Sequence, residues 1–168
     1  MNSNNIAVRN SLQQALLSLM QDKNINNISV TELIKRAEVG RMSFYRNYAT
    51  KEDIVLDALR QQTMPIIDEI RLEGRSFQWE DLFTIYETIK PTVALIYKSG
   101  KSHLLYYYIK SFNDIYDIRT FRQAYDYAAR AGLYFGILDQ WATGGFKESR
   151  EELAAIFNDY LTHKIGSL

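Results

Sequence analysis

The chain has 168 residues, enough for one core or for a small module joined to a larger one. Hydrophobic residues make up 46% and charged residues 24%, which is typical of a globular protein and not of a disordered or fibrous one. The lack of cysteine excludes disulfides, thiol catalysis and zinc–thiolate sites, and it predicts a reducing, cytoplasmic location. Because no apolar stretch approaches the roughly 18 residues that span a bilayer, and the N-terminus lacks a signal peptide's apolar region, we expect no membrane partner.

The formal net charge of zero hides an uneven distribution. Residues 23–51 carry six Lys and Arg against two acidic residues, a net charge of +4, so the rest of the chain sums to −4. Zero net charge alone argues against nucleic-acid binding, but a short basic segment on a mildly acidic body is typical of a small DNA-reading module.

The first elements are predicted to be helices separated by short polar breaks. Apolar residues at helical spacing predict a first helix from Ile6, with a break over 22–27. Ser29-Val-Thr-Glu32 is a capping box that predicts a helix start, and 38–40 breaks this second helix. A short third helix is expected over 41–48. Thr50-Lys-Glu-Asp53 then predicts a longer helix over 51–71, which Pro65 should bend or interrupt.

A linker at 74–78 separates this N-terminal part from a helical remainder. We expect helices over 79–90, 91–98, 102–117 and 118–143, the last ending at Gly144-Gly145, and a final helix capped by Ser149-Arg-Glu-Glu152. No strand-period segment and no internal repeat stands out. The predicted fold is therefore all-α: a helix-turn-helix domain over 1–50, a connecting helix over 51–73, and an effector-binding and dimerisation domain over 74–168.

Two short helices joined by a three-residue break and followed by a longer helix have the geometry of a helix-turn-helix. Apolar side chains could hold these helices together, whereas polar ones would face outward on the second of them. Arginine and asparagine offer paired hydrogen bonds to base edges, and hydroxyl groups and Lys51 suit phosphates. The apolar set is Val30, Leu33, Ala37, Val39, Phe44 and Tyr48, and the outward set is Arg41, Ser43, Tyr45, Arg46 and Asn47.

The residues of this region resemble those of the TetR family of regulators. The resemblance lies in Ser29-Val-Thr-Glu-Leu-Ile, Ala37-Glu-Val, Phe44-Tyr-Arg-Asn-Tyr48 and Lys51-Glu-Asp, and it covers about residues 6–60. It implies a three-helix DNA-binding module, a connecting helix, and a helical body that dimerises and senses a ligand. Family DNA contacts, carried over by position, fall on Ser29, Thr31, Arg41, Met42, Ser43, Tyr45, Arg46, Asn47 and Lys51.

The chain departs from the family pattern in the turn and beyond it. Glu38 stands where the family often has a turn glycine, which costs about 1 kcal/mol if the backbone requires a positive φ. Gly40 replaces a capping serine or threonine, at a cost of only a few tenths of a kcal/mol. Asn47 and Tyr48 replace a frequent histidine and phenylalanine.

Aromatic residues are concentrated in the body, where ten of the twelve tyrosines lie beyond residue 60. As a set they could line an apolar cavity with polar tips, the usual composition of a small-ligand site. The alternative for each single residue is an ordinary packed core aromatic whose hydroxyl reaches water. The candidate pocket residues are Tyr86, Tyr97, His103, Tyr107, Phe112, Tyr125, Phe135 and Trp141. His103 and His163 do not make a metal site, and no cofactor is expected.

Two apolar stripes run along the predicted 118–143 helix, so one can face the core and the other a partner. Small residues at four-residue spacing would allow a close approach of helices, and the final helix has an apolar stripe of its own. We therefore expect a homodimer through Ala128, Gly132, Gly136, Ile156, Phe157 and Tyr160. A dimer would also place two reading heads at a fixed spacing along DNA. Residues 127–157 further resemble a TetR-type C-terminal domain whose group includes regulators of dihydroxyacetone kinase genes.

The combined prediction is a dimeric, sequence-specific regulator that binds a double-stranded operator, most simply a repressor released by an unknown small molecule. Activation of a metabolic operon, as activator or co-activator, is the alternative, followed by an adaptor that binds protein instead of DNA. An enzyme is not expected, because the chain has no GxSxG elbow, phosphate-binding loop, HExxH motif or nucleophilic cysteine. The sequence identifies neither the operator nor the ligand.

Overall fold

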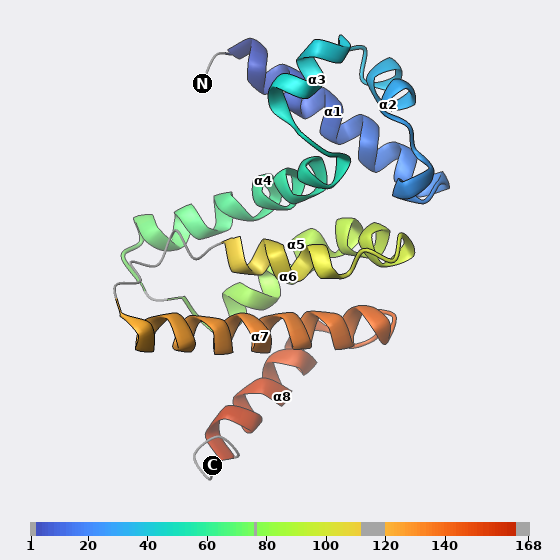
Figure 1. Ribbon diagram of the computed structural model, residues 1–168. Helices are drawn as coiled ribbons and strands as arrows, with labels where there is room; N and C mark the ends of the chain where they lie inside the picture. Colours follow the sequence, from blue (N-terminus) through green and yellow to red (C-terminus); the bar gives the residue numbers. More distant parts are fainter. Residues whose placement is uncertain (1–2, 76, 112–119, 164–168) are drawn as a thin grey trace.

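The computed structural model describes residues 3–75, 77–111 and 120–163, in which eight α-helices and one 3₁₀ helix account for the regular structure. No strand occurs in these ranges, which confirms the all-α prediction. The three N-terminal helices form one end of the molecule, α4 to α7 lie beneath them, and α8 lies at the opposite end (Figure 1).

The N-terminal end contains α1 (Ser3–Asp22), the 3₁₀ helix η1 (Ile25–Asn27), α2 (Val30–Arg36) and α3 (Arg41–Asn47). As the capping sequence predicts, the Ser29 hydroxyl accepts a hydrogen bond from the Glu32 amide at 3.1 Å. The reciprocal half of the predicted box is wrong, because the Glu32 carboxylate instead pairs with Lys23. At this N-terminus the ammonium of a nearby lysine competes successfully with a backbone amide for the carboxylate.

Helix α4 (Lys51–Leu72) follows directly and connects the N-terminal end to the body. Its start is a complete capping box between Thr50 and Asp53, as expected. Pro65 lies inside α4 without ending it, so the helix continues for two more turns beyond the expected point of interruption. The proline ring is on the exposed side of the helix, where water can satisfy the carbonyl that loses its amide partner.

The body is made of α5 (Trp79–Lys98), α6 (His103–Lys110), α7 (Phe121–Thr143) and α8 (Arg150–His163). The predicted break at Pro91 is wrong, because α5 is one continuous helix that contains this proline. Its buried stripe, which includes Phe83, Ile89, Val93 and Ile96, extends across the proline, while Pro91 itself is exposed. Packing of that stripe outweighs the loss of one backbone hydrogen bond.

The ends of the other body helices follow local signals. Helix α6 ends at Lys110 and α7 begins after the capping box of Thr120 and Gln123, later than the expected start at 118. Residues 112–117 of the predicted 102–117 helix lie outside the described residues. Gly144 and Gly145 stop α7 as expected, and the Ser149–Glu152 box starts α8, with the Ser149 amide donating to Glu152 at 2.8 Å.

One continuous cluster of buried side chains connects the N-terminal end to the body. It runs from Leu12 and Leu16 in α1, through Phe44 in α3 and Ile54 in α4, to Leu138 in α7. The linker after α4 therefore separates segments of the chain, but the packing continues across it.

Candidate DNA-binding site

Helix α3 presents two different faces. Phe44 and Tyr48, the latter capping the helix end, are buried against α1 and α4, and Leu33 anchors α2 in the same core. All six apolar residues predicted to join these helices belong to the core cluster or pack against it. Because Phe44 and Tyr48 are about one helical turn apart and share the inner face, Tyr45 and Arg46 between them point away from the protein.

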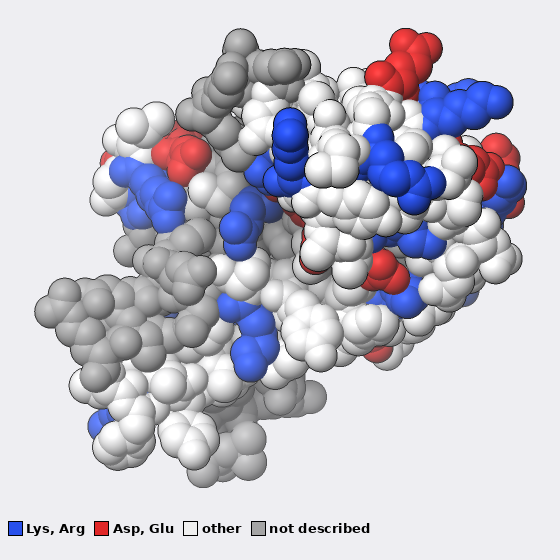
Figure 2. All heavy atoms as spheres, turned by 45° about the horizontal axis from the view of Figure 1, so that its top comes forward, with Lys and Arg blue, Asp and Glu red and all other residues white. Residues whose placement is uncertain are grey.

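The outward face of α3 carries the polar residues that the sequence singled out. Arg41 and Arg46 are exposed, Met42 is 66% exposed and Tyr45 is 53% exposed, with Ser43 and Asn47 partly covered. Basic side chains are distributed over much of this end of the molecule, which faces the viewer in Figure 2. Helix α3 therefore offers guanidinium groups, hydroxyl groups and an amide on one exposed surface.

Two contacts orient side chains on this surface before any ligand arrives. The Arg41 Nη2 donates to the hydroxyl of Thr31 at 2.7 Å, which connects the start of α3 to α2. The Asn47 amide donates to the Ser43 carbonyl at 2.8 Å. Thr31 itself is exposed beside Ser29 at the start of α2, so these two predicted contact residues lie on the same side of the molecule as Arg41.

The turn between α2 and α3 contains the two departures from the family pattern. Glu38 has a φ of 56°, so the backbone does adopt the left-handed conformation for which glycine is best suited. Gly40 is the N-cap residue of α3, with an extended φ of −73° and no side-chain cap. The turn therefore carries backbone strain at its centre and leaves the first amides of α3 without a side-chain acceptor.

Lys51, at the first position of α4, is engaged inside the protein. Its Nζ donates to the main-chain carbonyls of Ile25 at 2.6 Å and Ile28 at 2.5 Å. Its neighbour Glu52 forms an ion pair with Lys101 at 3.1 Å. Burial alone would raise the pKa of Glu52, but the hydrogen bond and charge of Lys101, together with Lys51, lower it.

A partly buried polar cluster connects α1, α3 and α4 beneath the exposed face of α3. The Asp57 carboxylate accepts from Arg9 Nε at 3.1 Å, from Gln13 at 2.5 Å and from the Tyr48 hydroxyl at 2.5 Å. Burial opposes ionisation of Asp57, yet these hydrogen bonds and the Arg9 charge lower its pKa. Burial and the Asp57 contact raise the pKa of Tyr48 to about 12. Sequence reasoning did not find this cluster, because its members are far apart in the chain and belong to no motif.

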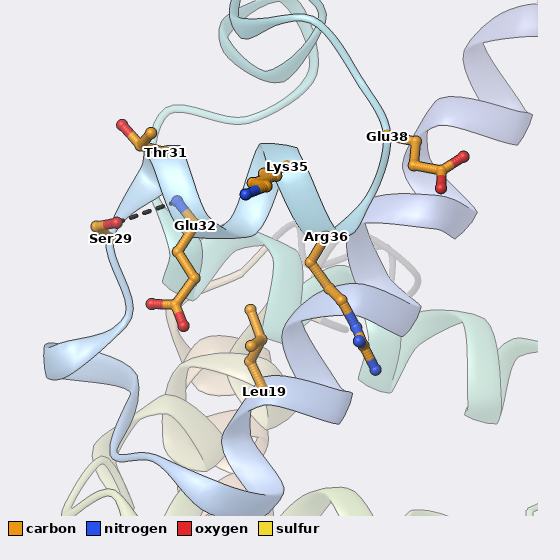
Figure 3. Close-up of a pocket in the computed structure, with 7 residues that line it drawn as sticks. All are labelled: Leu19, Ser29, Thr31, Glu32, Lys35, Arg36 and Glu38. Carbon is orange, nitrogen blue, oxygen red and sulfur yellow. Dashed lines mark hydrogen bonds between the residues drawn. The ribbon is translucent and has the colours of Figure 1, made fainter.

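An open hollow lies beside α2, on the face that carries Thr31 and Lys35 (Figure 3). The Ser29–Glu32 cap forms one side of it, and Leu19 of α1 lies at its base. Arg36 projects over α1, where it donates to the Ser18 hydroxyl at 3.2 Å. Two of the predicted contact residues, Ser29 and Thr31, line the hollow. Its lining residues are Leu19, Ser29, Thr31, Glu32, Lys35, Arg36 and Glu38.

Two short helices joined by a tight turn, with an apolar inner face and an arginine-bearing outer face, define a helix-turn-helix DNA-binding protein. Residues 13–58 match the family model described as bacterial regulatory proteins, tetR family. This match supports the interpretation of the N-terminal module as a tetR-type DNA-binding domain, and of the protein as a DNA-binding transcriptional regulator rather than an enzyme. No curated protein matches the chain at a significant level.

The predicted pocket residues occupy different environments in the body. Tyr86 and Trp141 are buried, and their polar atoms donate to the carbonyls of Tyr134 at 2.6 Å and Glu148 at 3.0 Å. The Tyr97 hydroxyl pairs with Asp139, and the Phe135 ring packs edge-on against Tyr106.

The remaining pocket candidates lie nearer the surface. His103 packs edge-on against Tyr107, which is 60% exposed, and Tyr125 is 75% exposed on α7. Phe112 lies outside the described residues. The seven described candidates thus divide between the core and the surface, and the role of the whole set in ligand binding stays a prediction.

The predicted dimer residues lie on α7 and α8. Ala128, Gly132 and Gly136 are exposed along α7, and within the described part of the chain a Cβ added to either glycine would meet no atom within 4 Å. Ile156 is 56% exposed on α8, whereas Phe157 packs against Phe83. The side chain of Tyr160 lies outside the described residues.

The described part of the chain contains no group of three or more His, Cys, Asp or Glu residues that could hold a metal ion. None of the described helices is both long and apolar enough to cross a membrane.

Proposed function

We propose that the protein acts as a homodimer that binds a double-stranded operator through α3, represses transcription, and is released by a small-molecule ligand. The observation that carries the operator-binding part is the outward set on α3, with both arginines exposed and the aromatic anchors buried. In this proposal Arg41, Arg46 and Asn47 read base edges, while Ser29, Thr31, Met42, Ser43 and Tyr45 contact phosphates, sugars or methyl groups.

The affinity for duplex DNA, measured at increasing salt concentration, tests the proposed operator binding. The wild-type protein should bind a labelled duplex, selected from a random library, and lose affinity steeply between about 50 and 200 mM salt. Arg46→Ala should weaken that binding by about tenfold or more, which corresponds to one good base contact. Tyr107→Ala, a matched loss of an exposed side chain in the body, should leave the affinity for DNA unchanged. Indifference of the wild-type protein to DNA at about 50 mM salt would overturn the proposal.

The exposed face of α7 supports a dimer. Phe121 is 82% exposed and Tyr125 is 75% exposed, an unusual state for large apolar rings in a free monomer. Glycine inside a helix costs about 1 kcal/mol relative to alanine, and no neighbouring atom of the described residues explains Gly132 or Gly136. A second copy packed closely against this face would account for both the exposed rings and the glycines.

Sedimentation at micromolar concentration tests the dimer. Tyr125→Asp should shift the wild-type dimer to monomer, because it places a charge in the proposed interface. Leu72→Asp provides the control, since Leu72 is 89% exposed on α4 and belongs to neither α7 nor α8. A wild-type protein that sediments as a monomer would contradict this part of the proposal.

The ligand site is proposed among α5, α6 and α7, where aromatic side chains with polar tips meet. In support, Tyr97 of α5 pairs with Asp139 of α7, and Tyr106 of α6 packs against Phe135 of α7. Small metabolites can be screened for release of the bound duplex. Tyr97→Phe should change the ligand concentration needed for release and leave the affinity for DNA without ligand unchanged. Increased transcription in the presence of the protein would instead indicate an activator.

A further inference from the structure

Lys51 stands where the family resemblance implies a phosphate contact, but its ammonium group is already used. Two of its three hydrogen-bond donors point at the carbonyls of Ile25 and Ile28, at 2.6 and 2.5 Å. The side chain is partly buried between the start of α4 and the 3₁₀ helix η1. These are charge-assisted hydrogen bonds, roughly twice as strong as bonds between neutral groups.

The segment that accepts hydrogen bonds from Lys51 is itself buried, and it also forms a hydrogen bond with the body. Ile25 has no exposed surface, and its amide donates to the hydroxyl of Ser99, from the turn between α5 and α6, at 3.3 Å. The Ile25 carbonyl also accepts from the Ile28 amide at 3.2 Å. Both main-chain polar atoms of Ile25 are thus engaged, the amide by the body and the carbonyl by α4.

This segment determines where α2 begins. Ile28 directly precedes Ser29, the N-cap of α2, and α2 in turn holds Arg41 through Thr31. A lysine that moved to a DNA phosphate would leave the carbonyls of Ile25 and Ile28 without their charged donor. The Ile25 carbonyl would then keep only the Ile28 amide, at 3.2 Å, and a buried acceptor that loses a charged donor is destabilised. The internal position is therefore the favoured one.

We propose that Lys51 is a positioning residue, which acts on DNA binding through the main chain of Ile25 and Ile28 and does not itself neutralise a phosphate. The inference rests on the proposed operator binding. In this proposal the charge of Lys51 maintains the internal geometry of the helix-turn-helix module, and the residues of α2 and α3 make the phosphate contacts.

The salt dependence of DNA binding separates the two roles. Each phosphate contact contributes about 0.9 to the slope of log affinity against log salt concentration on duplex DNA. Lys51→Met should weaken binding to the selected duplex by about tenfold with the wild-type slope, because the loss is one of geometry. A slope shallower by about 0.9 would identify a direct phosphate contact and overturn the proposal.

Amide hydrogen exchange in the free protein gives a second, DNA-independent measurement. The amides of Asn27 and Ile28 donate within η1, so they should exchange faster in Lys51→Met. Lys35→Met is the matched control, an exposed lysine of α2, and should leave this exchange unchanged. Unchanged exchange in Lys51→Met would overturn the proposal even if DNA binding is lost. Should Lys51→Met not fold, Lys51→Gln, which keeps an N–H donor, replaces it in both measurements. Failure of the wild-type protein to bind any duplex would instead refute the proposed function, and exchange would still report on Lys51.

Discussion

Glu38 is the residue of the N-terminal DNA-binding module whose backbone conformation is most clearly strained. Its φ of 56° costs a residue with a Cβ about 1–2 kcal/mol, whereas glycine adopts the same conformation without strain. Replacement by glycine also frees the unfolded chain, which offsets about 0.4–1 kcal/mol of the gain. The residue is exposed, so neither effect involves loss of core packing.

Glu38→Gly is therefore expected to stabilise the protein by about 0.5 kcal/mol, measured by urea denaturation. Glu38→Ala removes the same charge but keeps the Cβ, and it should give no such gain. Equal stabilisation by both variants would mean that the charge and not the backbone is responsible. Phe146 has the same φ of 56°, but its ring packs edge-on against Trp141, so Phe146→Gly should destabilise the protein.

Asp57 makes the stability of the reading head depend on pH. Its pKa is lowered in the folded protein, so its contribution is present above the unfolded value of about 3.9 and is lost as the pH falls through the lower folded value. Asp57→Asn should cost about 2 kcal/mol at neutral pH, because it breaks charged hydrogen bonds to Arg9.

Urea denaturation of wild type and Asp57→Asn across the acid range checks this sign. The difference between the two proteins should be largest near neutral pH and should shrink below about pH 4. Arg9→Met is a companion variant that removes the same pair from α1, and it should lose the part of this pH dependence that Arg9 contributes, while the Tyr48 and Gln13 hydrogen bonds to Asp57 remain. A difference that grows on acidification would contradict the assignment.

At the scale of helices, capping sequences were the most reliable part of the prediction. The starts at Ser29, Thr50 and Ser149 were found within a residue or so, because an N-cap is decided by side chains three positions apart. The break expected at Pro91 was wrong, since local rules say that proline interrupts a helix and say nothing of the buried stripe that keeps α5 intact.

The candidate site, like the helices, was predicted where it depends on local sequence and was missed where it depends on contacts between distant positions. The outward set on α3 followed from spacing and resemblance, because it depends on seven consecutive residues. The contacts of Lys51, and those of Asp57 with α1, could not be predicted, since they bring together positions that are 23 to 48 residues apart. Such contacts are created by the packing of helices and leave no local pattern in the sequence.

The cap of α4 offers a test at this scale. Thr50→Ala should destabilise the protein by about 1 kcal/mol and speed up amide exchange at Asp53, whose N–H donates to the Thr50 hydroxyl at 3.1 Å. Thr50→Ser keeps that acceptor and should behave like the wild type. Loss of stability in both variants would point to the methyl group and not to the cap.

The whole molecule is expected to unfold as one unit, because a single buried cluster includes α1 and the body helices. Leu16→Ala, at a fully buried position of α1, should cost about 3 kcal/mol. Both tryptophans lie in the body, at positions 79 and 141, so their fluorescence reports on unfolding there. The fluorescence midpoint should move with Leu16→Ala as far as the circular dichroism midpoint does. Leu72→Ala, at an exposed position, should move neither.

The hydrogen bond from the Ile25 amide to Ser99 and the ion pair between Lys101 and Glu52 matter when DNA-binding modules are exchanged between proteins. A reading head transplanted onto a foreign body would meet another turn beneath its 3₁₀ helix and lose both contacts. A working chimaera should therefore carry the turn at 99–101 together with residues 1–73, although the two stretches are separated in the chain. Changes in DNA specificity are therefore expected at the exposed residues of α3, because these residues can vary without disturbing the contacts of Ser99 and Lys101.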